Sequence, residues 1–112
     1  MKSHAIQTIP LRAERALKKF GQDIKDARRR RRIPTSIMAQ RAMISTSTLA
    51  RAEKGSPEVS MGIYITILFI LGLDQKLADL ADIRGDEVGL DLEEERLPKR
   101  IQLAKKKKEG DL

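Results

Sequence analysis

The sequence contains no cysteine and no tryptophan, and aromatic residues make up only 3% of its 112 residues. Without cysteine, a disulfide scaffold and a thiolate metal site are both excluded, and a reducing cytoplasm is the compatible compartment. The core therefore has to come from the aliphatic residues within the 40% apolar content. A chain of this length is enough for one small domain, and we expect an all-α fold.

Patterns typical of membrane proteins and enzymes are missing as well. The N-terminus lacks the charged-then-apolar order of a signal peptide. The most apolar stretch, residues 59–73, is too short to span a bilayer. The sequence offers no Ser–His–Asp set, no Gly-rich phosphate loop and no metal-ligand spacing. We therefore expect no catalytic activity, no cofactor, no metal ion and no membrane contact.

Positive charge is concentrated in the first half of the chain, which has a net charge of +7 overall. Residues 1–58 contain 14 Lys/Arg and 5 Asp/Glu, residues 59–95 contain 2 and 9, and residues 96–112 contain 7 and 2. A strongly basic region is typical of a protein that binds the phosphate groups of nucleic acid. We expect the first half to face nucleic acid and the acidic middle to face away from it.

Two short helices joined by a tight turn are predicted between Thr35 and Gly55. Ser45 is a suitable N-cap for the second helix, about Thr46 to Lys54, because its hydroxyl can accept from the free N–H groups of the first turn. Gly55 is a natural residue to end that helix in the left-handed conformation. The predicted inward-facing residues of the two helices are Met38, Ala39, Ala42, Leu49 and Ala52.

This stretch resembles the Xre/Cro-type helix-turn-helix regulators. The resemblance runs from about Phe20 to Leu73 and rests on Met38–Ala39, Ile44–Ser45, Leu49, Glu53 and Gly55 at fixed spacing. It implies a compact five-helix, lambda-repressor-like DNA-binding domain. Two positions depart from the family pattern, since Thr35 stands where Gln is usual and Met43 where Gly is usual. A residue other than glycine costs roughly 1–2 kcal/mol in the left-handed conformation, so the turn is either strained or built differently.

The resemblance also implies roles for polar residues. The positions that match the family's base-reading residues are Thr46, Ser47 and Arg51. Arg51 is the most informative, because Arg can hold O6 and N7 of guanine in two parallel hydrogen bonds. The expected phosphate contacts are Thr35, Arg29, Arg30, Arg31, Arg32, Arg41 and Lys54. Plain solvation is the alternative for these cations, and for the arginine run it takes the form of a solvated helix end. Arg28 matches an arginine that pairs with Glu53 inside the domain, so we expect Arg28 and Glu53 to form a structural pair.

Apolar periodicity predicts further helices at residues 11–31, 61–71, 74–81 and 90–97. Gly21 is expected to weaken the first of them slightly. Ser60 and Gly72 are expected to cap the two ends of the second, and Leu73, Leu77 and Leu80 to face inward along the third. The resulting organisation is an N-terminal arm (1–10), a helix-turn-helix domain (11–81) and a largely flexible C-terminal extension with a basic tail (82–112).

The helix at residues 61–71 is apolar on all sides. The set Met61, Tyr64, Ile67, Leu68 and Leu71 is enough for a core stripe. A helix that is apolar all round has to be buried all round, so we expect a partner surface. Regulators of this type pair around a two-fold axis and bind an inverted-repeat operator in double-stranded DNA. The predicted homodimer interface consists of Ile63, Ile65, Phe69, Ile70, Leu73 and Leu77.

Later segments resemble the HipB-like antitoxins, the helix-turn-helix partners of HipA-type serine/threonine kinase toxins. These segments are Glu53–Pro57, Val59–Gly62, Leu71–Leu73 and Glu93–Ile101. The resemblance implies a bacterial, cytoplasmic and nucleoid-associated repressor that controls its own operon and has a HipA-type kinase toxin as partner. One alternative is a free-standing phage or chromosomal regulator. The other is a basic module that binds RNA or acidic proteins.

Overall fold

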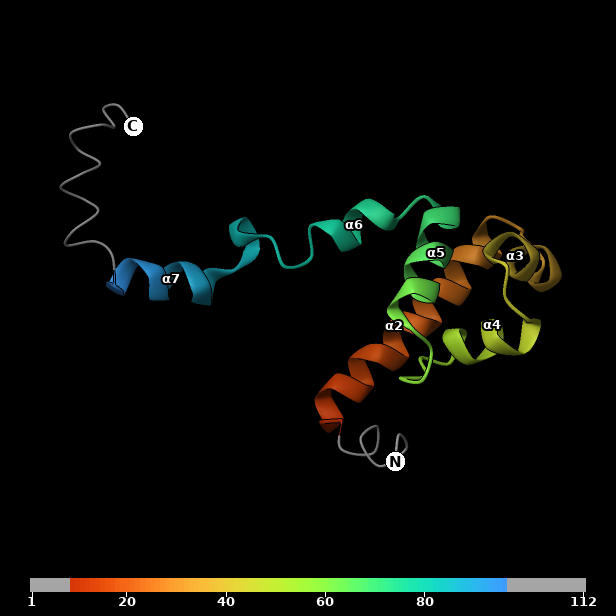
Figure 1. Ribbon diagram of the computed structural model, residues 1–112, viewed down its shortest axis with the longest axis horizontal. Helices are drawn as coiled ribbons and strands as arrows, with labels where there is room; N and C mark the ends of the chain where they lie inside the picture. Colours follow the sequence, from red (N-terminus) through yellow and green to blue (C-terminus); the bar gives the residue numbers. More distant parts are fainter. Residues whose placement is uncertain (1–8, 97–112) are drawn as a thin grey trace. The chain divides into compact units, whose positions relative to one another are not determined.

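The computed structural model describes residues 9–96, and this part of the chain contains helices and no strand (Figure 1). The all-α fold class is confirmed for these residues. Most of the predicted N-terminal arm and the basic tail lie outside the described residues. The elements are α2 (Leu11–Arg30), α3 (Thr35–Ala42), α4 (Thr46–Glu53), α5 (Met61–Leu71), α6 (Asp74–Ala78), the 3-10 helix η1 (Ile83–Gly85) and α7 (Glu87–Arg96).

The chain divides into two units, residues 1–77 and 78–112. The boundary falls after Leu77, whereas the sequence predicted the end of the domain at Ala81. Helix α6 ends at Ala78, before the predicted end. Leu80 is therefore past the helix and 76% exposed, so the prediction that it faces inward is wrong.

Helix α7 of the second unit begins earlier than the sequence predicted. Its expected start was residue 90, with Gly89 as an interruption. In the structure Gly89 lies inside the helix, and its N–H donates to a carboxylate oxygen of Asp86 at 3.1 Å. This side-chain cap satisfies a free N–H of the first turn, and so the helix can start at Glu87.

In the first unit, α4 and α5 pack against α2, and α3 packs against α4 and α5 (Figure 1). All the inward positions predicted for α3 and α4 are buried. Met61, predicted for the core, is 66% exposed, and that prediction is wrong because Met61 lies on the outer side of the first turn of α5. The buried apolar residues are Ile24, Ala27, Met38, Ala39, Ala42, Leu49, Ala52, Val59, Tyr64, Ile67, Leu68 and Leu71.

An aromatic pair joins α2 to α5. The ring centroids of Phe20 and Tyr64 are 5.5 Å apart, in a tilted arrangement. The Tyr64 hydroxyl donates to the Ser56 carbonyl at 2.7 Å, so the ring also holds the segment that follows α4. Burial raises the pKa of Tyr64, because desolvation disfavours the phenolate.

Each of the helices α2 to α5 is followed, within two residues of its end, by a residue in the left-handed region. These residues are Arg32, Met43, Gly55 and Gly72, with φ values of 54°, 58°, 74° and 79°. In each case the next residue's N–H reaches back to a carbonyl in the helix, as from Ile44 to Ala39 at 3.0 Å. Of the two alternatives considered for the turn at Met43, strained or built differently, the structure therefore has the strained one. The Met43 side chain is 90% exposed. Arg32 is a second strained position, which the sequence did not predict.

Two glycines allow α2 and the end of α4 to meet backbone to backbone. A Cβ atom on Gly21 would lie 2.7 Å from the Ala52 carbonyl oxygen and 2.9 Å from that of Glu53. A Cβ atom on Gly55 would lie 2.6 Å from the Cα of Lys18. Real Cβ atoms do not approach backbone atoms so closely. Gly21 thus does more than weaken α2 slightly, since it makes the contact with α4 possible.

Replacing Gly21 with alanine should lower the free energy of unfolding by about 1–3 kcal/mol, the usual effect of an overpacked contact, because the methyl group pushes α4 away from α2. Gly62→Ala is the matched control. A Cβ atom on Gly62 meets only the Ser60 Oγ, at 3.8 Å, and alanine is the better helix former. Denaturant unfolding followed by circular dichroism measures both variants. Equal stability of the two would contradict the close contact.

Candidate nucleic-acid interface

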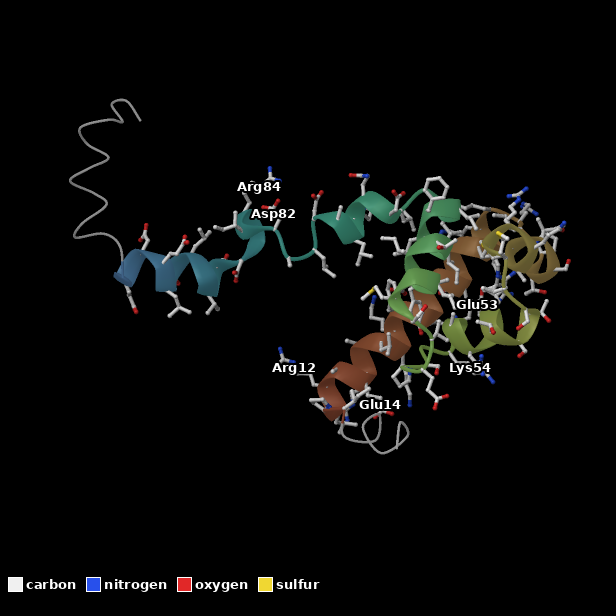
Figure 2. All side chains as sticks on the ribbon, viewed as in Figure 1. Arg12, Glu14, Glu53, Lys54, Asp82 and Arg84 are labelled. Atoms are coloured by element: carbon white, nitrogen blue, oxygen red, sulfur yellow. The ribbon has the colours of Figure 1, made fainter. Side chains whose placement is uncertain are left out.

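A buried ion pair holds the C-terminal end of α4 against α2. The Arg28 Nε donates to Glu53 Oε2 at 2.7 Å, and its Nη2 donates to Oε1 at 3.1 Å. The two side chains are only 8% and 6% exposed, and Figure 2 shows Glu53 on α4. A further Arg28 donor, Nη1, binds the Ile33 carbonyl at 2.9 Å. The pair predicted from the sequence is present, and it fixes how α4 lies on α2.

The opposite end of α4 is open to solvent. Ser45 caps it, since its Oγ accepts from the Thr48 N–H at 3.0 Å, as predicted. The predicted base-reading residues, Thr46, Ser47 and Arg51, are all exposed. Thr46 and Ser47 present their hydroxyl groups at this end of the helix. Arg51 lies in the last turn, and its Nη2 reaches back to Thr48 Oγ1 at 3.2 Å.

A groove of about 530 Å³ lies between α2, α3 and α4. It brings together three of the predicted site residues, Thr35, Thr46 and Lys54, around the Arg28–Glu53 pair. Both α3 and α4 enter it with their first residue, Thr35 and Thr46. Figure 2 shows Lys54 next to Glu53, where α4 ends. The lining residues are Lys18, Gln22, Lys25, Arg28, Thr35, Thr46, Leu49, Ala50, Glu53 and Lys54.

Two lysines of the groove were missed by the sequence analysis. Lys18 and Lys25 come from α2 and line the same groove as Arg28. Residues seven apart on a helix share a face, so the spacing of Lys18 and Lys25 could have placed them together. Their position beside α4, however, depends on which face of α2 packs against it.

The other predicted phosphate contacts lie outside the groove. Arg29 and Arg30 are exposed in the last turn of α2, and Arg41 is exposed in the last turn of α3. The Arg31 Nη1 donates to the Ala27 carbonyl at 2.8 Å, and the Arg32 backbone is in the left-handed region. Arg31 therefore also caps the helix end, the alternative considered for the arginine run.

Thr48 is a third residue that the sequence analysis missed. Its Oγ1 accepts from Arg51 Nη2 at 3.2 Å and from Ser45 Oγ at 3.0 Å. Thr48 and Arg51 are three apart on α4, which puts them on one side of the helix. That spacing was the available signal, but many residue pairs three apart on a helix make no such bond.

Most of the predicted dimer face belongs to the domain's own core. Ile63, Ile70, Leu73 and Leu77 are partly buried and pack against it. The physical reason is that α5 packs against both α2 and α3, which takes up more of its circumference than one stripe. Ile65 is half-buried, and Phe69 is 68% exposed.

The outer side of α5 carries an apolar row of three residues. Met61, Ile65 and Phe69 are four apart along the helix, so they lie in line on one side. Met61 is as open as Phe69, at 66% exposed. We refer to these three residues as the α5 row.

Residues 9–96 contain no cluster of His, Cys, Asp or Glu side chains able to hold a metal ion. None of the helices in that range is long and apolar enough to cross a membrane. The surface features to be explained are therefore the groove, the tip of α4 and the α5 row.

Substituting Glu53 with alanine should lower the free energy of unfolding by about 3–5 kcal/mol, because it leaves the buried Arg28 without its partner. Asp23→Ala is the control, since it breaks an exposed pair with Lys19 at 2.7 Å and should change stability by under about 1 kcal/mol. Thermal melts compare both with the unmodified chain. If the thermal unfolding curve of Glu53→Ala were identical to that of the unmodified chain, the claim that the Arg28–Glu53 pair stabilises the fold would be wrong.

The chain matches no family model, no curated protein and no solved structure. Any assignment of function therefore depends on the geometry of α2, α3 and α4 and on the residues at the tip of α4.

Proposed function

We propose that this chain is a sequence-specific transcriptional repressor that binds double-stranded DNA through a helix-turn-helix formed by α3 and α4. The observation that carries the proposal is the asymmetry of α4. Its C-terminal end is anchored by the buried Arg28–Glu53 pair, while its N-terminal tip is exposed and carries Thr46 and Ser47. Arg51, in the last turn, is also exposed, and its guanidinium reaches back along the helix to Thr48 Oγ1. A helix fits the major groove of B-form DNA, and helix-turn-helix proteins insert the N-terminal residues of the second helix.

The charges around α4 support the same docking. Lys18 and Lys25 on α2 and Lys54 after α4 line the groove. These cations would lie beside a DNA strand when α4 occupies the major groove, and Lys or Arg contacts to phosphate supply most of the nonspecific affinity. The Glu53 carboxylate, which would repel phosphate, is neutralised by Arg28.

The repressor works as a homodimer on an inverted repeat in this proposal. A single helix reads only a few base pairs, and a two-fold dimer doubles the site. The α5 row offers an exposed apolar surface for a second copy. Half-sites should then lie roughly one helical turn, about 10 base pairs, apart or a multiple of that.

We further propose that the repressor is the autoregulating antitoxin of a HipBA-like operon, with a HipA-type kinase toxin as partner. This part depends on the sequence resemblance. The second unit also carries exposed apolar residues, as a protein-binding segment does, among them Ile83, Val88 and Leu92. A kinase-toxin gene beside the gene for this chain would favour this reading. Its absence would favour a free-standing regulator.

Arg51→Ala should relax base preference at one position per half-site and weaken operator binding by about 1–3 kcal/mol, because a bidentate contact to guanine is lost. Selection from a random duplex library with both proteins measures the preference. Arg30→Ala is the contrasting variant. It should weaken all duplexes alike and make the dependence of affinity on salt less steep, since it removes a phosphate contact. An unchanged motif with Arg51→Ala would contradict the docking of α4.

Phe69→Lys should weaken dimerisation about 10- to 100-fold, because it replaces an aromatic side chain by a charge on the α5 row. Gln75→Lys is the control, since it adds the same charge at an exposed position of α6. Sedimentation at micromolar concentration gives the oligomeric state, and circular dichroism verifies that the helices persist. A Phe69→Lys variant that still sediments as a dimer would move the interface away from α5.

A further inference from the structure

The hydroxyl group of Thr48 accepts two hydrogen bonds. Arg51 Nη2 donates to its Oγ1 at 3.2 Å, and Ser45 Oγ donates to the same atom at 3.0 Å. A threonine hydroxyl has two lone pairs and one proton. The Thr48 hydroxyl is therefore held between the Arg51 guanidinium and the Ser45 hydroxyl.

Arg51 presents hydrogen-bond donors to the outside. It is exposed, and the structure of residues 9–96 uses only one of its N–H groups, the one on Thr48. A guanidinium carries five N–H donors and no acceptor. The Arg51 side chain thus presents only hydrogen-bond donors on this side of α4.

The bond to Thr48 also restricts the Arg51 side chain. A free arginine on a helix surface samples many rotamers, and the entropy lost in ordering it opposes binding. Thr48 holds one end of the guanidinium toward the N-terminal tip of α4, where the exposed Thr46 and Ser47 lie. Ser45 in turn orients the Thr48 hydroxyl. The chain Ser45–Thr48–Arg51 therefore links the helix cap to the proposed base-reading side chain.

We infer that Thr48 is a specificity-determining positioning residue, which aims the donor-only guanidinium of Arg51 at a base edge made of acceptors. This inference rests on the proposed DNA-binding function. In the major groove, guanine presents the acceptors N7 and O6, whereas cytosine presents an amino donor and adenine presents one beside its N7. The pair should accordingly favour guanine and disfavour a base whose amino group faces it.

Two substitutions distinguish the effect of the Thr48 hydroxyl from the effect of the rest of the side chain. Thr48→Val keeps the shape and also keeps the backbone N–H that donates to Ser45 Oγ, so the cap of α4 persists. Thr48→Ser keeps the hydroxyl. Thr66→Val is the matched control, because it removes a hydroxyl that donates to the Gly62 carbonyl on α5, a helix whose residues do not line the groove.

The experiment is a selection from a random duplex library, read as the ratio of guanine to the other bases at each enriched position. Thr48→Val should lower the guanine preference about tenfold at one position per half-site and leave affinity for random duplex unchanged. Thr48→Ser and Thr66→Val should retain the unmodified motif. A second measurement uses the free protein, in which NMR relaxation of the Arg51 Nε–H group should show greater mobility in Thr48→Val than in Thr48→Ser.

Each outcome decides a different point. A Thr48→Val motif identical to the unmodified one would overturn the inference and leave the proposed function standing. A loss of preference as large in Thr48→Ser as in Thr48→Val would also overturn it, because the hydroxyl would not be the cause. If the unmodified chain enriches no duplex at all, the proposed function fails and the specificity role fails with it, whatever the mobility of Arg51.

Discussion

The contact between α2 and the C-terminal end of α4 is the constraint on which the rest of the site depends. It is made in two ways at once. Gly21 and Gly55 let the two backbones touch, and Arg28 and Glu53 bridge the same helices with two hydrogen bonds. Because this end of α4 is fixed, its tip projects in one direction, and the groove that it forms with α2 has a defined set of lining residues.

The same contact also neutralises the negative charge of Glu53. A helix that lies against phosphate, as we propose for α4, gains nothing from a carboxylate, yet Glu53 occupies its last turn. Burial with Arg28 removes that negative charge from the surface and turns it into an anchor. Removing one partner of such a buried pair leaves an uncompensated charge. The other cations that line the groove are Lys18, Lys25 and Lys54, and they remain available to a ligand.

Much of the fold could be predicted from local signals. Ser45 and Ser60 marked helix starts, and Gly55 and Gly72 marked ends, because capping depends on a few neighbouring residues. The Arg28–Glu53 pair was reached through a family resemblance rather than through spacing. The importance of Gly21 was not predictable in the same way, since it depends on how closely a distant helix approaches. The hydroxyl chain from Ser45 to Arg51 needs side-chain conformations that no pattern of residue types specifies.

The errors have the same origin. Tyr64, Ile67, Leu68 and Leu71 of the predicted apolar stripe are buried, but Met61 is not. Ile63 and Ile70, which were surplus to the stripe, are partly buried because α5 packs against two helices. Leu80 fitted a helical repeat that ends too early to carry it. The apolar periodicity of a helix predicts which residues share a face. How many of its faces are covered depends on how all the helices of the unit pack together. The surface left over, the α5 row, is consequently smaller than the sequence predicted.

The most direct test of the account is a competition titration at fixed physiological salt. Labelled duplex taken from a binding selection is bound by the full-length chain and displaced by unlabelled duplex of the same sequence, by random duplex or by random RNA. The account predicts that the selected duplex competes at least about a thousandfold better than random duplex, which is the lower range for specific DNA binding. A selected duplex that competes no better than random duplex or random RNA would contradict it.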